Sequence, residues 1–328
     1  ASSLMKSEYL KGIDNQPIQP ESNSYGTLQS YSHYRLTFPN ELTQLTLSGN
    51  YILSITDSYG TELFSRRFVV YTPQVNVPAE VKRARDLKYY DTQQVVQFTI
   101  NQKDFRLDNP QVAVKVAVLQ NYRWDTAITG LKPQYIIGNE LVYRYDRETA
   151  FWAGNEYFYF DSKDIRVAAS GIARFTRDRL VGSYLFTNVS RTNSVYTYYP
   201  DINGDFLITT VNGANPANEA DYTQVHFALE GKSTFWGKEV YVYGKFSNYE
   251  LRDEYKLTYD EKDGLFKGKV LLKQGFYNYK FATKEGRTID FNEIGGNFYQ
   301  TENTYIILVY YRAPGALYDE VVGVGATK

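Results

Sequence analysis

The chain has 328 residues, of which 36 are Lys or Arg and 37 are Asp or Glu, so its formal net charge is −1 at pH 7. This balance excludes the strongly basic surface with which proteins bind nucleic acid or an anionic membrane. The chain has no cysteine, which excludes disulfide scaffolds, thiol catalysis and zinc–cysteine sites. It also lacks an apolar run of about 18 residues, the length of a transmembrane helix.

Tyrosine is the most informative residue type, because the chain has 32 tyrosines and only two histidines. Tyrosine favours strands and combines an apolar ring with a polar tip. Histidine and cysteine are the side chains that most often transfer protons, bind metals or attack substrates near neutral pH. The composition therefore predicts a β-rich binding protein rather than an enzyme, with no catalytic, cofactor or metal site.

Short runs of alternating polar and apolar residues recur along the chain and predict strands. In His33–Phe38, for example, Tyr34, Leu36 and Phe38 alternate with more polar residues. Gly, Asn, Asp and Pro separate the runs, as in hairpins and sandwich loops. No window of 12 residues has a helical period, so we expect an all-β chain. The further runs, in chain order, are Asn50–Thr56, Arg67–Tyr71, Val95–Ile100, Val112–Leu119, Glu140–Tyr145, Thr223–Leu229, Glu239–Phe246, Leu265–Leu272, Gly275–Ala282 and Tyr305–Tyr311.

Two segments have the composition of joints between domains. Tyr71–Pro78 contains two prolines, and Val211–Glu219 is small, polar and rich in turn residues. They predict a division into residues 1–72, 73–212 and 213–328. The first part is short and begins with a polar stretch, Gly12–Gly26, so we expect it to be the C-terminal part of a β-sandwich whose earlier strands are absent from this chain. The other two parts are expected to be complete β-sandwiches.

Two short motifs approach known ligand-binding patterns without matching them. Gly231–Thr234 is similar to the end of a phosphate-binding loop, but His226 occupies the position of the earlier glycine. Asp201–Asp205 has the alternating oxygen side chains of a calcium loop, but Phe206 and Asn212 replace the required Gly and Glu. We interpret the two segments as a polar hairpin loop and an Asn-Gly turn.

The large aromatic residues are the candidates for partner contacts. In a β-protein most of them are buried in the core or paired across strands. Trp124 is the strongest exception, because Asn121–Asp125 has the composition of a loop, and Trp236 is a second candidate. The segments Glu156–Phe160 and Tyr196–Tyr199 are so aromatic that both faces must be covered, either by a core or by another protein.

The C-terminal part resembles the immunoglobulin-like early-set fold of glycogen-binding modules. The resemblance rests on the order of Val240–Tyr249, Lys256–Tyr259, Gly264–Leu272 and Gly275–Phe281. Those modules stack sugars on exposed tryptophans, whereas here Tyr249 stands where Trp is usual. Tyr249 is therefore a third candidate contact residue, and carbohydrate binding through this domain is the alternative function.

A longer resemblance covers nearly the whole chain and points to the plug proteins of the type IX secretion system. It rests on many short matches in one order: Ser32–Asn40, Ser48–Tyr51, Ala79–Ala84, Val118–Asp125, Leu131–Pro133, Gly138–Tyr143, Asp201–Gly204, Glu219–Tyr222, Leu271–Gly275 and Ile307–Arg312.

The resemblance to plug proteins implies a specific function. Such a protein is exported to the periplasm and binds the periplasmic opening of the outer-membrane β-barrel translocon, which it keeps closed without catalysis. The start of this chain, Ala1–Lys6, lacks the basic and apolar regions of a signal peptide, and an exported protein begins in the same way after processing. The expected partner is thus the translocon, and no catalytic or cofactor-binding residue is implied.

Overall fold

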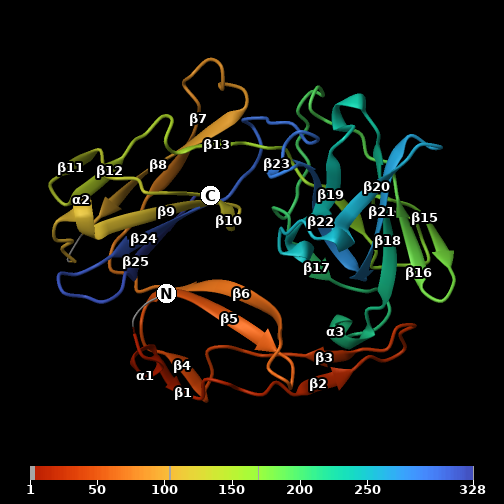
Figure 1. The fold of residues 1–328 in the computed structure, drawn as a ribbon, viewed down its shortest axis with the longest axis horizontal. Helices are drawn as coiled ribbons and strands as arrows, with labels where there is room; N and C mark the ends of the chain where they lie inside the picture. Colours follow the sequence, from red (N-terminus) through yellow and green to blue (C-terminus); the bar gives the residue numbers. More distant parts are fainter. Residues whose placement is uncertain (1–3, 103–104, 169, 328) are drawn as a thin grey trace.

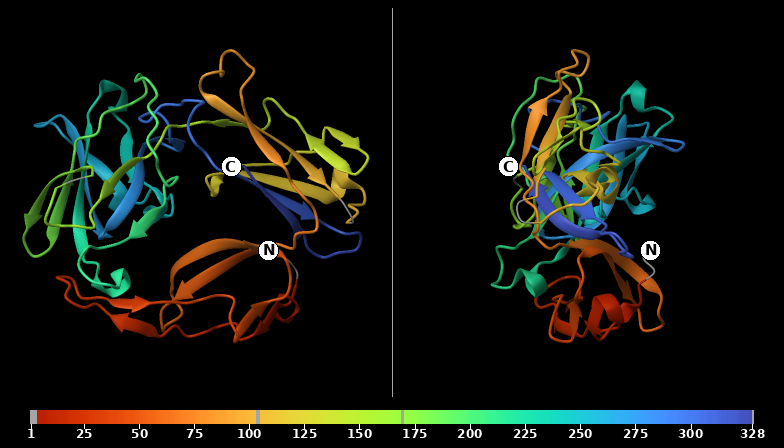
Figure 2. Two further views of the ribbon diagram at one scale, coloured as in Figure 1. Left: turned by 180° about the vertical axis from the view of Figure 1, so that it is seen from behind. Right: turned by 90° about the vertical axis from the view of Figure 1, so that its left-hand side faces the viewer.

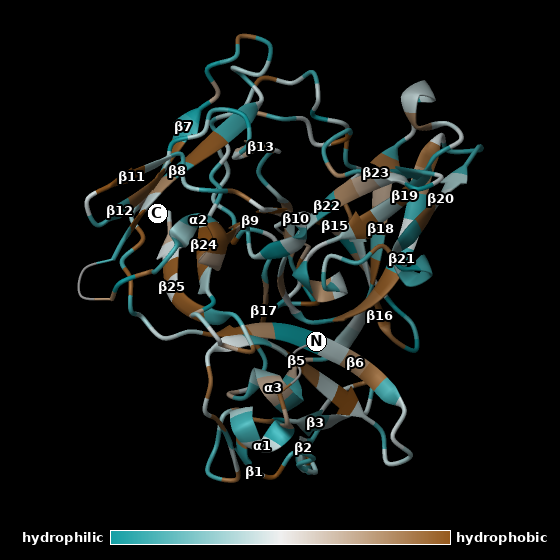
Figure 3. Ribbon diagram, turned by 60° about the vertical axis from the view of Figure 1, so that its left-hand side comes forward, coloured by the Kyte–Doolittle hydropathy of each residue, from teal (hydrophilic) through white to brown (hydrophobic). Residues whose placement is uncertain are grey.

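The computed structural model describes residues 4–102, 105–168 and 170–327. These residues form short strands and single-turn helices, which confirms the all-β prediction. None of the described helices has the length and hydrophobicity needed to cross a bilayer. The chain is arranged as three bodies, each of which contacts the other two (Figure 1). In Figure 3 the hydrophobic stretches lie mainly along the strands of the two sandwiches.

The first body, residues 4–72, consists of two-stranded ribbons. Strands β1 and β4, β2 and β3, and β5 and β6 pair with each other. Among its described residues no apolar side chain is buried, although Thr43 and Ser48 are. The described ribbons therefore enclose no apolar core. The elements are α1 (Lys6–Tyr9), β1 (Leu10–Gly12), β2 (Pro20–Asn23), β3 (Ser32–Tyr34), β4 (Thr43–Leu45), β5 (Gly49–Thr56) and β6 (Glu62–Val70).

The second body is a β-sandwich of two antiparallel sheets. One has the order β11-β12-β8-β13, with β7 beside β8, and the other has the order β10-β9-β24-β25. Val96 and Ile100 of β8 pack toward Val116 and Val118 of β9 and Ile307 of β24. The elements are β7 (Ala79–Arg83), β8 (Gln93–Asn101), α2 (Pro110–Ala113), β9 (Val114–Gln120), β10 (Arg123–Thr129), β11 (Tyr135–Ile137), β12 (Glu140–Tyr143), β13 (Ala150–Trp152), β24 (Tyr305–Tyr311) and β25 (Glu320–Ala326).

The third body is built from one continuous sheet with the order β14-β22-β19-β20-β21-β18-β16-β15, and β17 and β23 also pair with β22. Its core combines Phe160 of β14, Phe227 of β18 and Phe281 of β22. The elements are β14 (Phe158–Asp161), β15 (Ile172–Arg177), β16 (Val181–Leu185), β17 (Phe206–Ile208), α3 (Pro216–Glu219), β18 (Tyr222–Glu230), η1 (Ser233–Phe235), β19 (Glu239–Tyr243), η2 (Lys245–Ser247), η3 (Asp253–Tyr255), β20 (Lys256–Asp260), β21 (Leu265–Lys273), β22 (Gly275–Glu285) and β23 (Thr288–Asp290).

The sheet pairing does not follow the predicted division at residue 212. Strands β14 and β17 pair with β22, and β16 pairs with β18, so these three strands belong to the third body. Strands β24 and β25 return to the second body, where β24 pairs with β9. The turn-rich segment Val211–Glu219 is therefore a loop within the third body. Strand pairing at long sequence distance leaves no local mark in the composition, which is why the composition placed the boundary incorrectly.

The first body bridges the two sandwiches. On one side the Tyr310 hydroxyl donates to Asn50 Oδ1 at 2.9 Å. On the other side the amides of Leu28 and Gln29 donate to the Asp221 carboxylate at 2.7 and 3.2 Å. The side view in Figure 2 shows the first body beneath the two sandwiches. The three bodies are thus joined in a closed arrangement rather than as a linear string.

Candidate interaction surface

Trp124 lies in strand β10 and not in the loop predicted for it. Asn121 and Tyr122 alone make the turn, with φ values of 50° and 61° that suit a tight hairpin. The half-buried Trp124 ring packs in an apolar cluster with Val69 of the first body. The Arg67 guanidinium carbon lies 4.9 Å from its ring centroid. Trp124 is therefore engaged where the first and second bodies meet.

Tyr249 lies at the junction of the second and third bodies. Its ring is half-buried, and its hydroxyl donates to the Asn203 carbonyl at 3.3 Å. Burial raises the pKa of this phenol. The Arg123 guanidinium carbon lies 5.6 Å from the Tyr249 ring centroid and 4.2 Å from that of Phe291. Arg123, in turn, forms an ion pair of 2.5 Å with Asp125. Tyr249 is thus part of the internal packing between two bodies.

Trp236 is the candidate whose side chain is open to solvent, with 66% of the residue exposed. It follows the short helix η1, which begins within the Gly231–Thr234 segment. A three-residue 3₁₀ turn lacks the row of amide groups that an α-helix offers to a phosphate. The segment is a loop but not the predicted hairpin loop, because β18 pairs with β16 and β21, whereas β19 pairs with β20 and β22. Trp236 stays a candidate contact residue.

The carboxylates of the Asp201–Asp205 segment are used within the protein. Asp201 accepts hydrogen bonds from the amides of Tyr157 and Asn203 at 2.6 and 2.7 Å. Asp205 forms an ion pair of 2.5 Å with Lys245. Both acidic side chains therefore hold the loop against its neighbours, in keeping with a structural turn.

A buried polar cluster lies beside the crossover where the chain passes from the second body to the third. Glu156 is 1% exposed and accepts a hydrogen bond from the Tyr196 hydroxyl at 2.5 Å. Arg191 donates to the Glu156 carbonyl. The Lys280 amine lies 3.9 Å from the Tyr157 ring centroid. Burial raises the pKa of Glu156 and lowers the pKa of Lys280 to about 7 and that of Arg191 to about 10.

Exposed aromatic residues gather around the returning crossover, residues 298–304. The Arg83 guanidinium is held between two tyrosines, 3.4 Å from the Tyr90 ring centroid and 3.5 Å from that of Tyr299. The Tyr89 and Trp152 rings meet edge to face at 5.7 Å. Tyr90 is 41% exposed and Trp152 is 48% exposed, so the group presents apolar area to solvent.

The same aromatic surface continues onto the third body. The Tyr198 hydroxyl donates to Glu302 at 3.1 Å, and Tyr198 is 53% exposed. The Tyr196 ring lies 5.8 Å from Phe298 on the crossover. We define the crossover surface as Arg83, Tyr89, Tyr90, Trp152, Tyr198 and Tyr299. Protein interfaces are enriched in these residue types, so this is the best candidate for a partner contact.

Part of the crossover surface can be recognised from the sequence. Tyr198 belongs to the aromatic segment Tyr196–Tyr199, for which a covering core or partner was expected. The pair Tyr89–Tyr90 stands in a polar loop between β7 and β8, and such a pair in a loop is itself a signal for exposure. The sequence does not show that this pair lies beside Trp152 and Tyr299, because only the path of the crossover in the fold brings these residues together.

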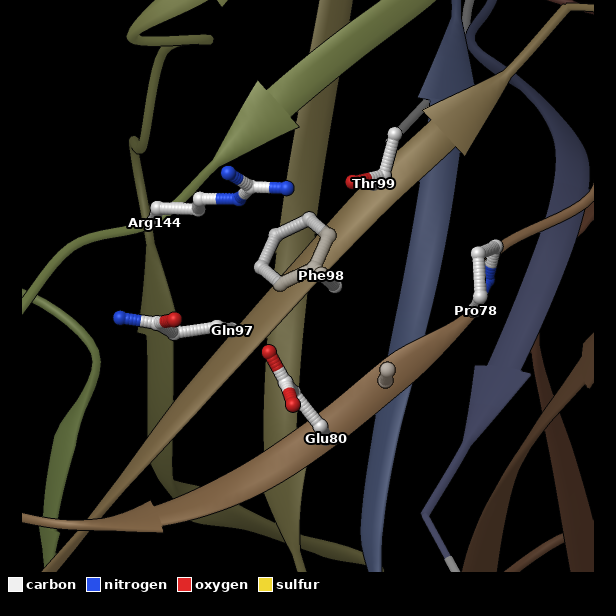
Figure 4. A pocket seen from close by; sticks show the side chains of 7 residues that line it. Pro78, Glu80, Gln97, Phe98, Thr99 and Arg144 are labelled. Carbon is white, nitrogen blue, oxygen red and sulfur yellow. The ribbon is translucent and has the colours of Figure 1, made fainter.

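A small hollow of about 280 Å³ lies beside strands β7, β8 and β12. Its lining includes Glu80, Gln97, Phe98 and Arg144 (Figure 4). Gln97 is itself engaged, because its amide group donates to the Tyr145 carbonyl at 3.4 Å. The described residues contain no group of three or more His, Cys, Asp or Glu side chains placed to hold a metal ion. We assign no chemistry to this hollow.

Comparisons with known proteins place these features in a family. Residues 1–72 match the family model described as "Type 9 secretion system plug protein 1st domain". A crystal structure of a hypothetical protein from Parabacteroides merdae ATCC 43184 is similar over 99% of this chain and 83% of that chain, with 34% sequence identity and a TM-score of 0.94. The comparison with curated proteins found no match. The matched range of the family model coincides with the first body. The chain belongs to the type 9 secretion system plug protein family.

Proposed function

We propose that this chain is a non-enzymatic plug that binds the periplasmic opening of the outer-membrane translocon of the type IX secretion system and blocks it. The observation that carries the proposal is the match of residues 1–72 to the first domain of the plug protein family. A periplasmic location at the inner face of the outer membrane is part of the proposal. The mechanism is steric and needs no reactive side chain.

The arrangement of the three bodies supports occlusion as a mechanism. A protein that blocks an opening must keep its shape, so its domains must not move relative to one another. Each body here contacts the other two, as the Asp221 and Asn50 hydrogen bonds and the Arg123 packing show. Domains joined by a single linker usually move relative to each other. Here the contacts of each body with both of the others restrict that motion.

The crossover surface has the side chains that favour a protein contact. Its aromatic rings offer large area at a low cost in conformational entropy, and Arg83 is already held in place between two of them. We therefore place the translocon contact on the crossover surface. Trp236, which follows η1, is not among the residues of the crossover surface and serves as a comparison in the test below.

The carbohydrate-binding alternative required an open aromatic platform around Tyr249. Tyr249 is half-buried, and the Arg123 guanidinium lies 5.6 Å from its ring. A sugar ring that stacks on tyrosine needs an uncovered face, so this site gives the alternative no support.

The proposal is tested by affinity purification of the tagged, full-length protein from its own cells, with identification of the proteins that accompany it. Recovery of a very large outer-membrane translocon supports the plug. Recovery of a monomer without a membrane partner, under conditions that preserve the translocon, would refute it.

Variants then locate the contact. We expect the double variant Tyr90→Ser, Trp152→Ser to bind the translocon at least about tenfold more weakly, since central aromatic anchors each contribute about 2 kcal/mol or more. Tyr135→Ser is the matched control, because Tyr135 is 60% exposed on β11 and lies outside the crossover surface. Trp236→Ser tests the other candidate. A loss confined to Trp236→Ser would move the contact away from the crossover surface.

Binding should depend little on salt. The chain carries a net charge of −1, so long-range attraction contributes little to association. We expect the Kd for the translocon to change less than about threefold between about 50 and 500 mM NaCl. A loss of affinity of about tenfold or more over this range would show that charge pairs, rather than aromatic burial, hold the complex.

A further inference from the structure

Four side chains form a row across the outer face of the third body. Strands β15, β16, β18 and β21 are neighbours in one sheet. Their register places Arg174 opposite Tyr184, Tyr184 opposite His226, and His226 opposite Lys269. Directly opposed residues of neighbouring strands point to the same face, so the four side chains stand side by side.

The row is held together by stacking. The Arg174 guanidinium carbon lies 3.6 Å from the Tyr184 ring centroid. The rings of Tyr184 and His226 are 4.0 Å apart and nearly parallel, with an angle of 4° between their planes. Each ring therefore shows its edge, rather than its face, to solvent. Arg174 and His226 are fixed in position before any ligand arrives, which lowers the entropic cost of binding one.

The row forms one side of a hollow of about 410 Å³. Ala228 follows His226 two residues along β18 and faces the same side of the sheet. Its methyl group is small, so it leaves space for a ligand at the bottom of the hollow. Lys267 of β21, two residues before Lys269 and on the same face of the sheet, also lines the hollow. The hollow is thus a concave site with an apolar floor and positively charged walls.

The positive charge of the hollow is only partly compensated. Lys267 is paired with Asp260 at 2.9 Å and also with Asp263. Within the described residues, neither Arg174 nor Lys269 forms an ion pair with a carboxylate. The row therefore carries two cations that have no carboxylate partner among the described residues, one at each end. Burial, Lys269 and Arg174 together lower the pKa of His226.

We propose that this hollow binds a phosphate group, carried either by a small molecule or by a lipid headgroup. Guanidinium and ammonium groups are the side chains that bind phosphate oxygens, and Arg174 and Lys269 both line the hollow. The volume exceeds that of the phosphate alone, so the rest of the ligand lies over Ala228. The site lies in the third body and is independent of the crossover surface and of the plug function.

The histidines provide a direct readout. The chain has two, and His33 lies in the first body, where its Nε2 is 3.4 Å from Glu21. Inorganic phosphate, titrated into the full-length protein at pH 7, should shift the imidazole resonances of His226 with saturation and leave those of His33 unchanged. A bound dianion offsets the repulsion from Arg174 and Lys269, so the pKa of His226 should rise on binding.

Charge-removing variants complete the test. Arg174→Gln and Lys269→Gln should each weaken phosphate binding at least about tenfold, the expected loss for one charge-assisted hydrogen bond. Lys132→Gln removes the same charge from the second body and should have no effect. Thermal unfolding of each variant checks that the fold persists. Equal binding by Arg174→Gln, Lys269→Gln and Lys132→Gln, or parallel non-saturating shifts of both histidines, would overturn the proposal.

A vesicle experiment distinguishes the two sources of the phosphate. Vesicles of phosphatidylcholine with phosphatidic acid are compared with vesicles of phosphatidylcholine alone. Binding to the first kind that is lost in Lys269→Gln assigns the site to a lipid headgroup. Saturable binding of inorganic phosphate without vesicle binding assigns it to a soluble phosphate compound. Absence of both kinds of binding would refute the site.

Discussion

Lys280 provides the sharpest test of how the crossover is built. This lysine is 8% exposed, and its amine faces the Tyr157 ring at 3.9 Å. Burial lowers its pKa to about 7, against an ordinary value of 10.5, although Asp201 raises it in part. Between these two values the unfolded chain holds a proton that the folded chain releases. The free energy of unfolding should therefore rise with pH from about 7 upward.

The size of the effect follows from the two pKa values. One pKa unit corresponds to about 1.4 kcal/mol, so the charged form of Lys280 costs the fold at most about 5 kcal/mol. Between pH 7 and 9 the free energy of unfolding should increase by about 2 kcal/mol. Methionine keeps the apolar stem without the charge. We expect Lys280→Met to be more stable than the wild type at pH 7, by up to about 4 kcal/mol.

The assay is denaturant unfolding of the wild type and of Lys280→Met at several values between pH 7 and 9. The wild-type free energy should rise across this range, and that of Lys280→Met should stay nearly constant. Lys284→Met is the control, because Lys284 lies on the same strand and pairs with Glu239 at 3.6 Å near the surface. It should follow the wild-type curve. Parallel pH dependence in Lys280→Met and the wild type would refute the assignment to Lys280.

Three further substitutions test the contacts that position the bodies. Arg123→Ala should lower the free energy of unfolding by about 2–4 kcal/mol and speed proteolysis at the crossovers. Arg85→Ala is the control and should have little effect, because Arg85 belongs to an exposed ion pair. Asp221→Ala should cost about 1–3 kcal/mol and increase hydrogen exchange of the two first-body amides that it binds. Gly204→Ala should lower the Tm more than Gly237→Ala. Both glycines have positive φ, but only at Gly204 would the new methyl group meet a tyrosine ring, at 2.6 Å.

Local pattern predicted strands such as β18 well because one face of the strand is more deeply buried than the other. The alternation in Thr223–Leu229 predicted a strand, and β18 covers Tyr222–Glu230, with Val225, Phe227 and Leu229 buried. The period of two is a property of the pleat and needs no knowledge of the partner strand. The pattern does not say which strands pair. For this reason residues 158–208 were predicted to belong to the second domain, although their strands pair with those of the third.

The candidate contact residues show the same limit. Trp124, Trp236 and Tyr249 were proposed from residue type and local context, which do not reveal what another body covers. The first body covers Trp124 through Val69 and Arg67, and Arg123 of the second body reaches the ring of Tyr249. Whether an aromatic side chain is open to a partner is decided by contacts between segments far apart in the sequence.

The route of the chain joins the second and third bodies at two places. The chain leaves the second sandwich after β13 and returns to it at β24, so two crossovers join the same pair of bodies. The Gln94 amide donates to the carbonyls of Tyr299 and Thr301 at 2.7 and 2.8 Å, which fixes the returning crossover to the second sandwich. Two connections permit rotation about the line between them, and the first body, bound to both sandwiches, opposes that rotation. A molecule closed in this way keeps a fixed outline, and a fixed outline is the property that occlusion of an opening requires.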